Sequence, residues 1–235
     1  MICILLFLFL VPVHSPEKNF KDARQVARAI EAHYHRATTL KAHFFEKYSD
    51  GSGGVSAESG TVYFSKPGRM RWEYESPEEK LFIVDGANVW FYIPADRTAS
   101  RAKIGASSDW RTPLAFLTGE SDFDRLCRSM QIVDTSNADK GSSGDHLVNS
   151  GDALLRCLPR VTSDAPDQQI SEVLLEADNE DRLVRVAIRQ PGKLETEFRF
   201  GGWEENIPVP EAKFHFVAPP GVAIVDESTL AGALH

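Results

Sequence analysis

The stretch G-T-V-Y-F-S-K-P-G-R-M-R-W-E-Y-E-S-P, residues 60–77, decides the fold class. In its second half Met70, Trp72 and Tyr74 alternate with arginine and glutamate residues. Successive side chains of a β-strand point to opposite faces, so this alternation predicts a strand with one apolar face. A turn at residues 66–68 separates it from a β-rich run, which indicates two neighbouring antiparallel strands.

Similar signals extend in both directions from this stretch. Residues 81–84 end at an Asp-Gly pair, which is a hairpin signal, and residues 89–93 supply the returning strand. Further strand patterns cover residues 40–44, 98–104, 125–134, 153–158, 170–177, 183–190, 194–200 and 213–217, and the pattern at 98–104 is the weaker one. About ten antiparallel strands in one chain predict a mostly β protein, folded as an unclosed half-barrel.

Two segments have helical rather than β periodicity. Residues 19–37 place Val26, Ile30 and Tyr34 four apart, which predicts an amphipathic helix with one apolar stripe. A second, very short helix is indicated over residues 113–117. A helix of one turn is not stable alone, so we expect both helices to lie on the sheet as a lid.

The chain starts with an apolar run, MICILLFLFLVPV, residues 1–13. It is shorter than the roughly 20 residues that cross a bilayer and fits the apolar part of a secretory signal peptide over residues 1–16. No Lys or Arg precedes this run, which fits a signal peptide that is truncated at its N-terminus. The alternative is that residues 1–13 form an N-terminal strand or core segment. Residues 17–235 are then expected to form one exported domain.

Composition excludes some functions. The chain has 26 Lys and Arg against 34 Asp and Glu, a net charge of −8, which argues against a nucleic-acid partner. Its 14 Phe and 4 Trp are many large apolar side chains for an acidic protein. They either fill an ordinary core or line a hollow that holds a lipophilic ligand.

Motifs for catalysis are missing. The sequence contains no phosphate-binding glycine loop, no HExxH and no GxSxG, so we expect no enzyme activity and no cofactor. His33 and His35 are two apart and do not share a helix face, and no close cysteine pair supports a metal site. Cys127 and Cys157 are expected to form a disulfide if the chain is exported, although their spacing fits two separate buried thiols equally well.

Several segments, in order, resemble LolA, the family of periplasmic carriers of outer-membrane lipoproteins. They are T-T-L-K-A-H-F with D-G-S-G (residues 38–44 and 50–53), the stretch 60–77, D-G-A-N-V-W-F-Y-I-P (85–94), T-P-L-A-F-L (112–117), C-L-P-R (157–160) and F-H-F-V-A-P-P-G-V (214–222). The resemblance covers residues 20–226. It implies an unclosed β-barrel covered by helices, with a cavity that accepts the acyl chains of a lipoprotein.

The resemblance also implies partners and a place of action. Cargo would come from an inner-membrane ABC transporter of the LolCDE type and pass to an outer-membrane receptor of the LolB type. The protein would act in the periplasm as a monomeric chaperone without bond chemistry. A related lipid carrier or sensor of another envelope pathway is the alternative, and an enzyme acting on an apolar ligand is a third reading.

Candidate site residues follow from the strand pattern and the resemblance together. The cavity is expected to be lined by Phe44, Met70, Trp72, Leu81, Ile83, Trp90, Tyr92, Leu114, Phe116, Leu117 and Phe198. Which face of strand 89–93 points inward is left open, because both faces are apolar. Lys66 stands where the family has an arginine that holds the lid closed, and a lysine offers a point charge instead of a five-donor fork. Glu46 stands where the family often has glutamine.

Overall fold

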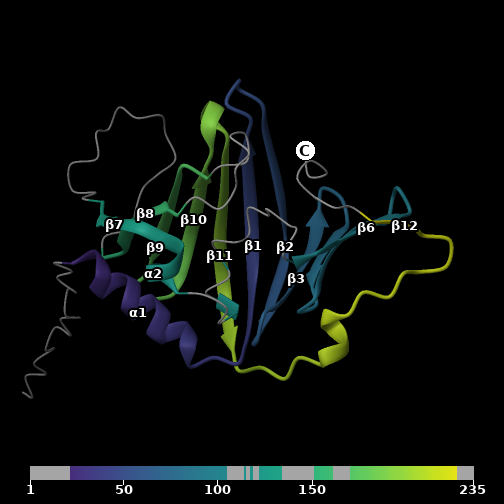
Figure 1. Ribbon diagram of the computed structural model, residues 1–235, viewed down its shortest axis with the longest axis horizontal. Helices are drawn as coiled ribbons and strands as arrows, with labels where there is room; N and C mark the ends of the chain where they lie inside the picture. The colour runs from purple at the N-terminus through teal and green to yellow at the C-terminus, as the bar shows by residue number, and fades with distance from the viewer. Residues whose placement is uncertain are drawn as a thin grey trace, which may run out of the picture.

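The computed structural model describes residues 22–104, 114, 117–118, 122–133, 151–160 and 170–226. The predicted signal segment 1–16 and most of the predicted helix 113–117 lie outside these residues. Twelve strands form one curved sheet in the order β12-β6-β5-β4-β3-β2-β1-β11-β10-β9-β8-β7 (Figure 1). The strand order begins with β12 and ends with β7, and these two strands do not pair with each other. Among the described residues the sheet is therefore open. The predicted class, a mostly β unclosed half-barrel with short helices, is confirmed.

The strands follow two runs of antiparallel neighbours. The first run contains β1 (Thr39–Ser49), β2 (Val55–Ser65), β3 (Arg69–Ser76), β4 (Lys80–Val84), β5 (Asn88–Ile93) and β6 (Thr98–Lys103). The second contains β7 (Cys127–Ile132), β8 (Ala153–Pro159), β9 (Glu172–Ala177), β10 (Leu183–Arg189) and β11 (Glu195–Glu205). The two runs join where β11 pairs with β1, which places the chain's longest strands at the centre of the sheet.

The C-terminal part differs most from the prediction. The expected strand at 213–217 is wrong: after Pro210 the chain turns into a 3₁₀ helix, η5 (Glu211–Phe214). A proline with φ of −58° suits entry into a helical turn and has no N–H for a strand ladder. The unpredicted β12 (Ala223–Asp226) pairs in parallel with β6. Residues 125–126 also belong to a short helix, α2 (Phe123–Leu126), and not to β7.

One long helix covers part of the sheet. Helix α1 (Ala23–His35) begins at Asp22, whose carboxylate accepts the Arg24 N–H at 3.0 Å. Its apolar stripe, Val26, Ala27, Ile30 and Tyr34, is buried, as the spacing predicts, and the helix contacts β7 and β8. We call the sheet face under α1 the inner face and the opposite one the outer face. Figure 1 shows α1 crossing the sheet below α2.

Candidate functional site

The inner face carries a continuous apolar surface. Phe44, Phe64, Phe198 and Phe200 surround Trp72, with ring centroids 4.9, 6.1, 5.3 and 6.2 Å from that of the indole. Most of these rings meet edge to face or tilted, the arrangements that aromatic pairs prefer. All five side chains belong to one buried cluster with the apolar stripe of α1. Part of the aromatic surplus of the sequence therefore concentrates on the inner face of the sheet.

Six of the predicted lining residues belong to this inner cluster. They are Phe44, Met70, Trp72, Leu114, Leu117 and Phe198. Phe116 lies outside the described residues. The six residues meet on one surface, although they come from three strands and from the segment before α2.

The other four predicted lining residues do not face α1. The register pairs Trp72 with Phe82 and Phe82 with Phe91, which places Leu81, Ile83, Trp90 and Tyr92 on the outer face. Their predicted place in the inner lining is wrong. The inner positions of β4 and β5 belong to Phe82, Val84, Val89 and Phe91. Sequence reasoning missed these four residues because β4 and β5 are apolar on both faces. The two-residue periodicity of a strand therefore could not show which face points inward.

The C-terminal segment explains why the outer face is apolar there. Residues 207–226, which we call the C-terminal arm, cross the outer face of β3 to β6 (Figure 1). The Phe216 ring lies 5.1 Å from Trp90 and 5.3 Å from Tyr92. Arg71 Nη1 donates to the Lys213 carbonyl at 3.0 Å. The outer apolar residues of β4 and β5 therefore pack under the arm.

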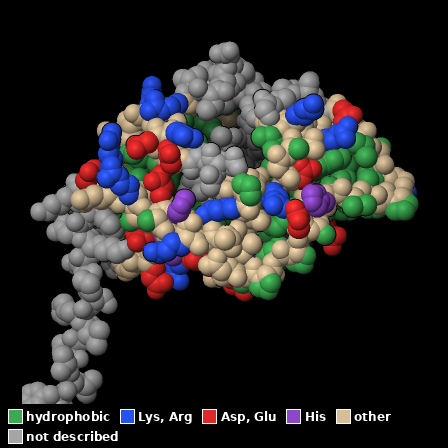
Figure 2. Space-filling view, turned by 60° about the horizontal axis from the view of Figure 1, so that its bottom comes forward, with side chains coloured by type: hydrophobic (Ala, Val, Ile, Leu, Met, Phe, Trp, Pro, Cys, Tyr) green, Lys and Arg blue, Asp and Glu red, His purple; other side chains and the backbone are tan. Residues whose placement is uncertain are grey.

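The far end of the arm exposes apolar side chains of its own. Val217, Ile224 and Val225 are exposed, and hydrophobic side chains gather at the right-hand end in Figure 2, where Figure 1 places the arm. Charged side chains of both signs are spread over the rest of this view. The arm thus packs at its start and shows an apolar end to solvent.

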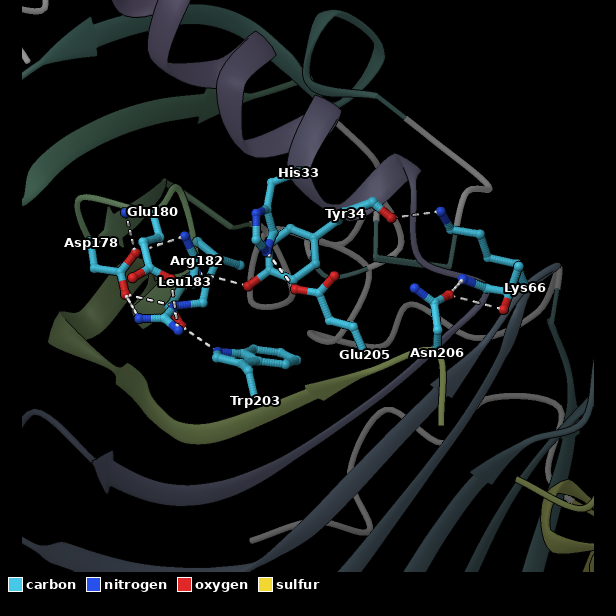
Figure 3. A network of polar contacts seen from close by, with 11 residues as sticks. His33, Tyr34, Lys66, Asp178, Glu180, Arg182, Leu183, Trp203, Glu205 and Asn206 are labelled. Carbon is cyan, nitrogen blue, oxygen red and sulfur yellow. Dashed lines mark hydrogen bonds and ion pairs between the residues drawn. The ribbon is translucent and has the colours of Figure 1, made fainter. Parts of the chain in front are cut away.

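Lys66 holds the C-terminal end of α1. Its ammonium donates to the carbonyls of Tyr34 at 2.8 Å and His35 at 3.0 Å, as Figure 3 shows for Tyr34. These carbonyls are among the last of the helix, which lack partners within it, and a cation also suits the helix's negative end. Burial lowers the pKa of Lys66, because the ammonium is partly withdrawn from water. The lysine thus takes the position on helix carbonyls that the resemblance implies for an arginine.

A second set of contacts fixes the last turn of α1 to β10 and β11 (Figure 3). The Tyr34 hydroxyl accepts the Leu183 N–H at 2.8 Å, and Trp203 Nε1 donates to the Leu183 carbonyl at 2.7 Å. His33 Nε2 lies 2.7 Å from a Glu205 carboxylate oxygen. Burial raises the pKa of Tyr34, so its hydroxyl stays neutral. Sequence reasoning used Tyr34 as an apolar stripe residue and missed its polar contact.

The middle of α1 reaches α2. The Glu31 carboxylate accepts the Phe123 N–H at 2.5 Å, at the first residue of α2. Burial raises the pKa of Glu31. The sequence offered no signal for this contact, because 92 residues separate the two partners.

Cys127 and Cys157 form a disulfide in the structure, with Cα atoms 5.5 Å apart. They lie on the neighbouring antiparallel strands β7 and β8, at diagonal positions: Cys127 is opposite Pro159 and Cys157 is opposite Met130. Both are buried in the inner cluster. The bond joins the outermost strand of the sheet, next to α1, to its neighbour.

The described residues contain no group of three or more His, Cys, Asp or Glu side chains placed to hold a metal ion. Over the same part of the chain, no helix has the length and apolar character needed to cross a membrane.

Comparison with known proteins agrees with this geometry. The family model "Outer membrane lipoprotein carrier protein LolA" matches residues 35–143. An outer-membrane lipoprotein carrier protein of Nitrosospira multiformis is 26% identical over 200 residues, covering 85% of this chain and 87% of that protein. One from Dechloromonas aromatica is 27% identical over 190 residues, covering 80% and 82%.

A solved structure shares the fold at low identity. An uncharacterized conserved protein from Thermus thermophilus superposes with a TM-score of 0.51 at 13% identity, covering 87% of this chain and 99% of that one. By the family-model match and by relatives that align along most of its length, this chain is similar to the lipoprotein carriers of the LolA family.

Proposed function

We propose that the protein carries acylated lipoproteins through the periplasm and shields their acyl chains between the inner face and α1. The observation that supports this most directly is the buried aromatic surface around Trp72, on the same sheet face as a helix that is fastened at one end through Lys66. The relatives, named outer-membrane lipoprotein carrier proteins, support the same role. The LolA family is a family of carriers and not of enzymes.

The physical need for such a carrier is large. Burying one methylene is worth about 0.8 kcal/mol, so an acyl chain of about 16 carbons resists transfer to water by roughly 12 kcal/mol. A carrier must cover the chains and still release them. A helix that rests on an apolar stripe and on a few polar contacts in its middle and last turns can open locally without unfolding the sheet.

The proposal includes the route of the cargo. Lipoproteins would arrive from an inner-membrane ABC transporter of the LolCDE type and leave to an outer-membrane receptor of the LolB type. The carrier would act as a monomer, and the hand-off would need no bond chemistry.

The first test is native purification from the periplasm with mass spectrometry of the bound material. We expect acylated lipoproteins to copurify. A lipid without any lipoprotein would instead support a related lipid carrier of another envelope pathway. Purification of the protein with no acylated molecule, from cells that export lipoproteins, would contradict the proposal.

The second test uses two neighbouring phenylalanines that point to opposite faces of β1. Phe44 is buried against Trp72, whereas Phe45 is 44% exposed on the outer face. We expect Phe44→Ala to lower the release of lipoproteins from spheroplasts, because it removes part of the inner surface. Phe45→Ala is the matched control and should release lipoproteins like the parent protein. Equal activity of the two variants would contradict the assignment of the inner face.

A further inference from the structure

The inner side chains of β1 to β4 change from apolar to polar along the strands. The register aligns them in rows that cross the sheet. The first row, nearest the Lys66 turn, contains Leu40, Phe64, Met70 and Val84, and the second contains Ala42, Val62, Trp72 and Phe82. All eight side chains are apolar and buried.

The next two rows are different. The third contains Phe44, Gly60, Tyr74 and Lys80, and the fourth pairs Glu46 directly with Glu58. Successive rows are two residues apart, about 7 Å along a strand. The inner face is therefore amphipathic along its length, with its charged side chains at the end far from the Lys66 turn.

The polar side chains of these rows contact one another. Tyr74 donates its hydroxyl hydrogen to Glu46 Oε2 at 2.8 Å, and Lys80 forms an ion pair with Glu58. We call Glu46, Glu58, Tyr74 and Lys80 the polar row. Gly60 lies between Phe44 and Tyr74 in the register. Because glycine has no side chain, the ring centroids of Tyr74 and Phe44 can approach to 5.0 Å.

The side chains of the polar row are of types that bind polar ligands. A carboxylate has about four acceptor sites, a tyrosine hydroxyl accepts as well as donates, and a lysine ammonium has three N–H groups. The side chains of Lys80 and Glu58 are 21% and 23% exposed, so solvent reaches them. Tyr74 is buried and links the polar row to the aromatic surface through Phe44.

We propose that the polar row binds the polar head of the acylated cargo, the glyceryl ester and amide groups at its lipid-modified N-terminus. The acyl chains then run along the apolar rows toward the Lys66 turn. Lys80 donates to an ester or amide carbonyl, and the carboxylates and the Tyr74 hydroxyl accept amide N–H groups. This inference rests on the proposed function and adds the orientation of the cargo and the residues that recognise its head.

The experiment compares two ligands with the full-length mature protein. One is a synthetic peptide with an S-dipalmitoylglyceryl cysteine at its N-terminus, used below its critical micelle concentration. The other is diphenylhexatriene, an apolar fluorophore without a polar head. Fluorescence titration gives the affinity for the fluorophore, and its displacement gives the affinity for the lipopeptide.

We expect Tyr74→Phe to weaken lipopeptide binding about 2- to 12-fold, the range that corresponds to one hydrogen bond. Binding of the fluorophore should stay within about twofold, because the ring remains. Tyr63→Phe is the matched control: it removes a hydroxyl from the outer face of β2, next to Lys213, and should change neither affinity. Lys80→Met should weaken lipopeptide binding in the same selective way.

The outcomes separate the two proposals. If the parent protein binds both ligands but the Tyr74 and Lys80 variants weaken both equally or neither, the head-binding inference is wrong and the carrier function stands. If the parent protein binds neither ligand, both proposals fail. Selective loss of the lipopeptide in both variants supports the inference.

Discussion

Two covers lie on opposite faces of the same sheet, α1 on the inner face and the C-terminal arm on the outer face. The arm contacts the sheet at successive points: Arg69 pairs with Glu211, Arg71 donates to the Lys213 carbonyl, and Phe216 packs on Trp90. It then becomes β12 and joins the backbone ladder. Helix α1 instead packs through one apolar stripe, with polar contacts in its middle and last turns.

This difference in attachment predicts a difference in mobility. A segment that contributes a strand to a sheet opens only when its ladder breaks, whereas a helix held by side chains opens at a lower free energy. The inner cover therefore suits reversible opening and the outer cover suits permanent packing. The aromatic cluster around Trp72 lies on the inner face, the face that carries the cover expected to open more easily.

The largest expected effect compares a tryptophan under each cover. Trp72 is fully buried on the inner face, and Trp90 is half-buried on the outer face, where its Nε1 donates to Asp85 at 3.0 Å. We expect Trp72→Ala to lower the free energy of unfolding by about 3–5 kcal/mol, because it leaves a large cavity. Trp90→Ala should cost less, about 1–2 kcal/mol. Urea denaturation measures both, and equal losses would contradict the contrast.

The disulfide comes next. Cys127 and Cys157 enclose a separation of 30 residues beside α1, and a cross-link of that length stabilises by about 3–4 kcal/mol through the unfolded state. We expect the double variant Cys127→Ala, Cys157→Ala to lose that much in a denaturant titration without a reductant. The parent protein titrated with a reductant serves as the control. No change in either titration would refute the bond.

Substitution of Lys66 is expected to have a smaller effect, which is limited to the local stability of α1. Lys66→Met removes both donations to the helix carbonyls, and hydrogen bonds from charged groups are worth about 1.5–3 kcal/mol. We expect hydrogen exchange of the α1 amides to speed up, while the β12 amides stay as in the parent. Lys66→Arg is the control, since its guanidinium also offers donors to carbonyls. Unchanged exchange in Lys66→Met would show that the apolar stripe alone holds α1.

The smallest effect is expected at an ion pair of the arm. Arg69 Nη1 lies 2.7 Å from Glu211, whose side chain is 72% exposed, and exposed pairs contribute about 0–1 kcal/mol. Arg69→Ala should therefore change the free energy of unfolding by no more than that, as measured by thermal denaturation. A larger loss would mean that the arm depends on this contact more than on its packing and its strand.

Local signals were enough for much of the architecture. The alternation around Trp72 predicted β3, the Asp-Gly pair predicted the hairpin of β4 and β5, and the spacing of Val26, Ile30 and Tyr34 predicted α1. Each of these elements is defined by residues close together in the chain. Period and turn chemistry act over that range, so the sequence alone reveals them.

The facing of β4 and β5 could not be predicted in the same way. Both the odd-numbered and the even-numbered residues of these strands are apolar. Only the pairing of Phe82 with Trp72 decides which set lies on the inner face. The outward-facing residues of β4 and β5 are apolar because the C-terminal arm packs on them. The arm reaches that position through contacts such as the one between Phe216 and Trp90. Sequence patterns carry no record of contacts between segments so far apart.

The sequence by itself therefore determined a strand-rich chain that resembles LolA, with one covering helix and an apolar surplus. The tertiary structure decided where that surplus goes: one part lies under α1 and the other under the C-terminal arm. It also decided that Lys66 meets the end of α1, through contacts that span 31 and 32 residues. Periodicity acts locally, whereas the partner of a strand face or of a charged side chain is chosen by which distant segments the closed core brings together.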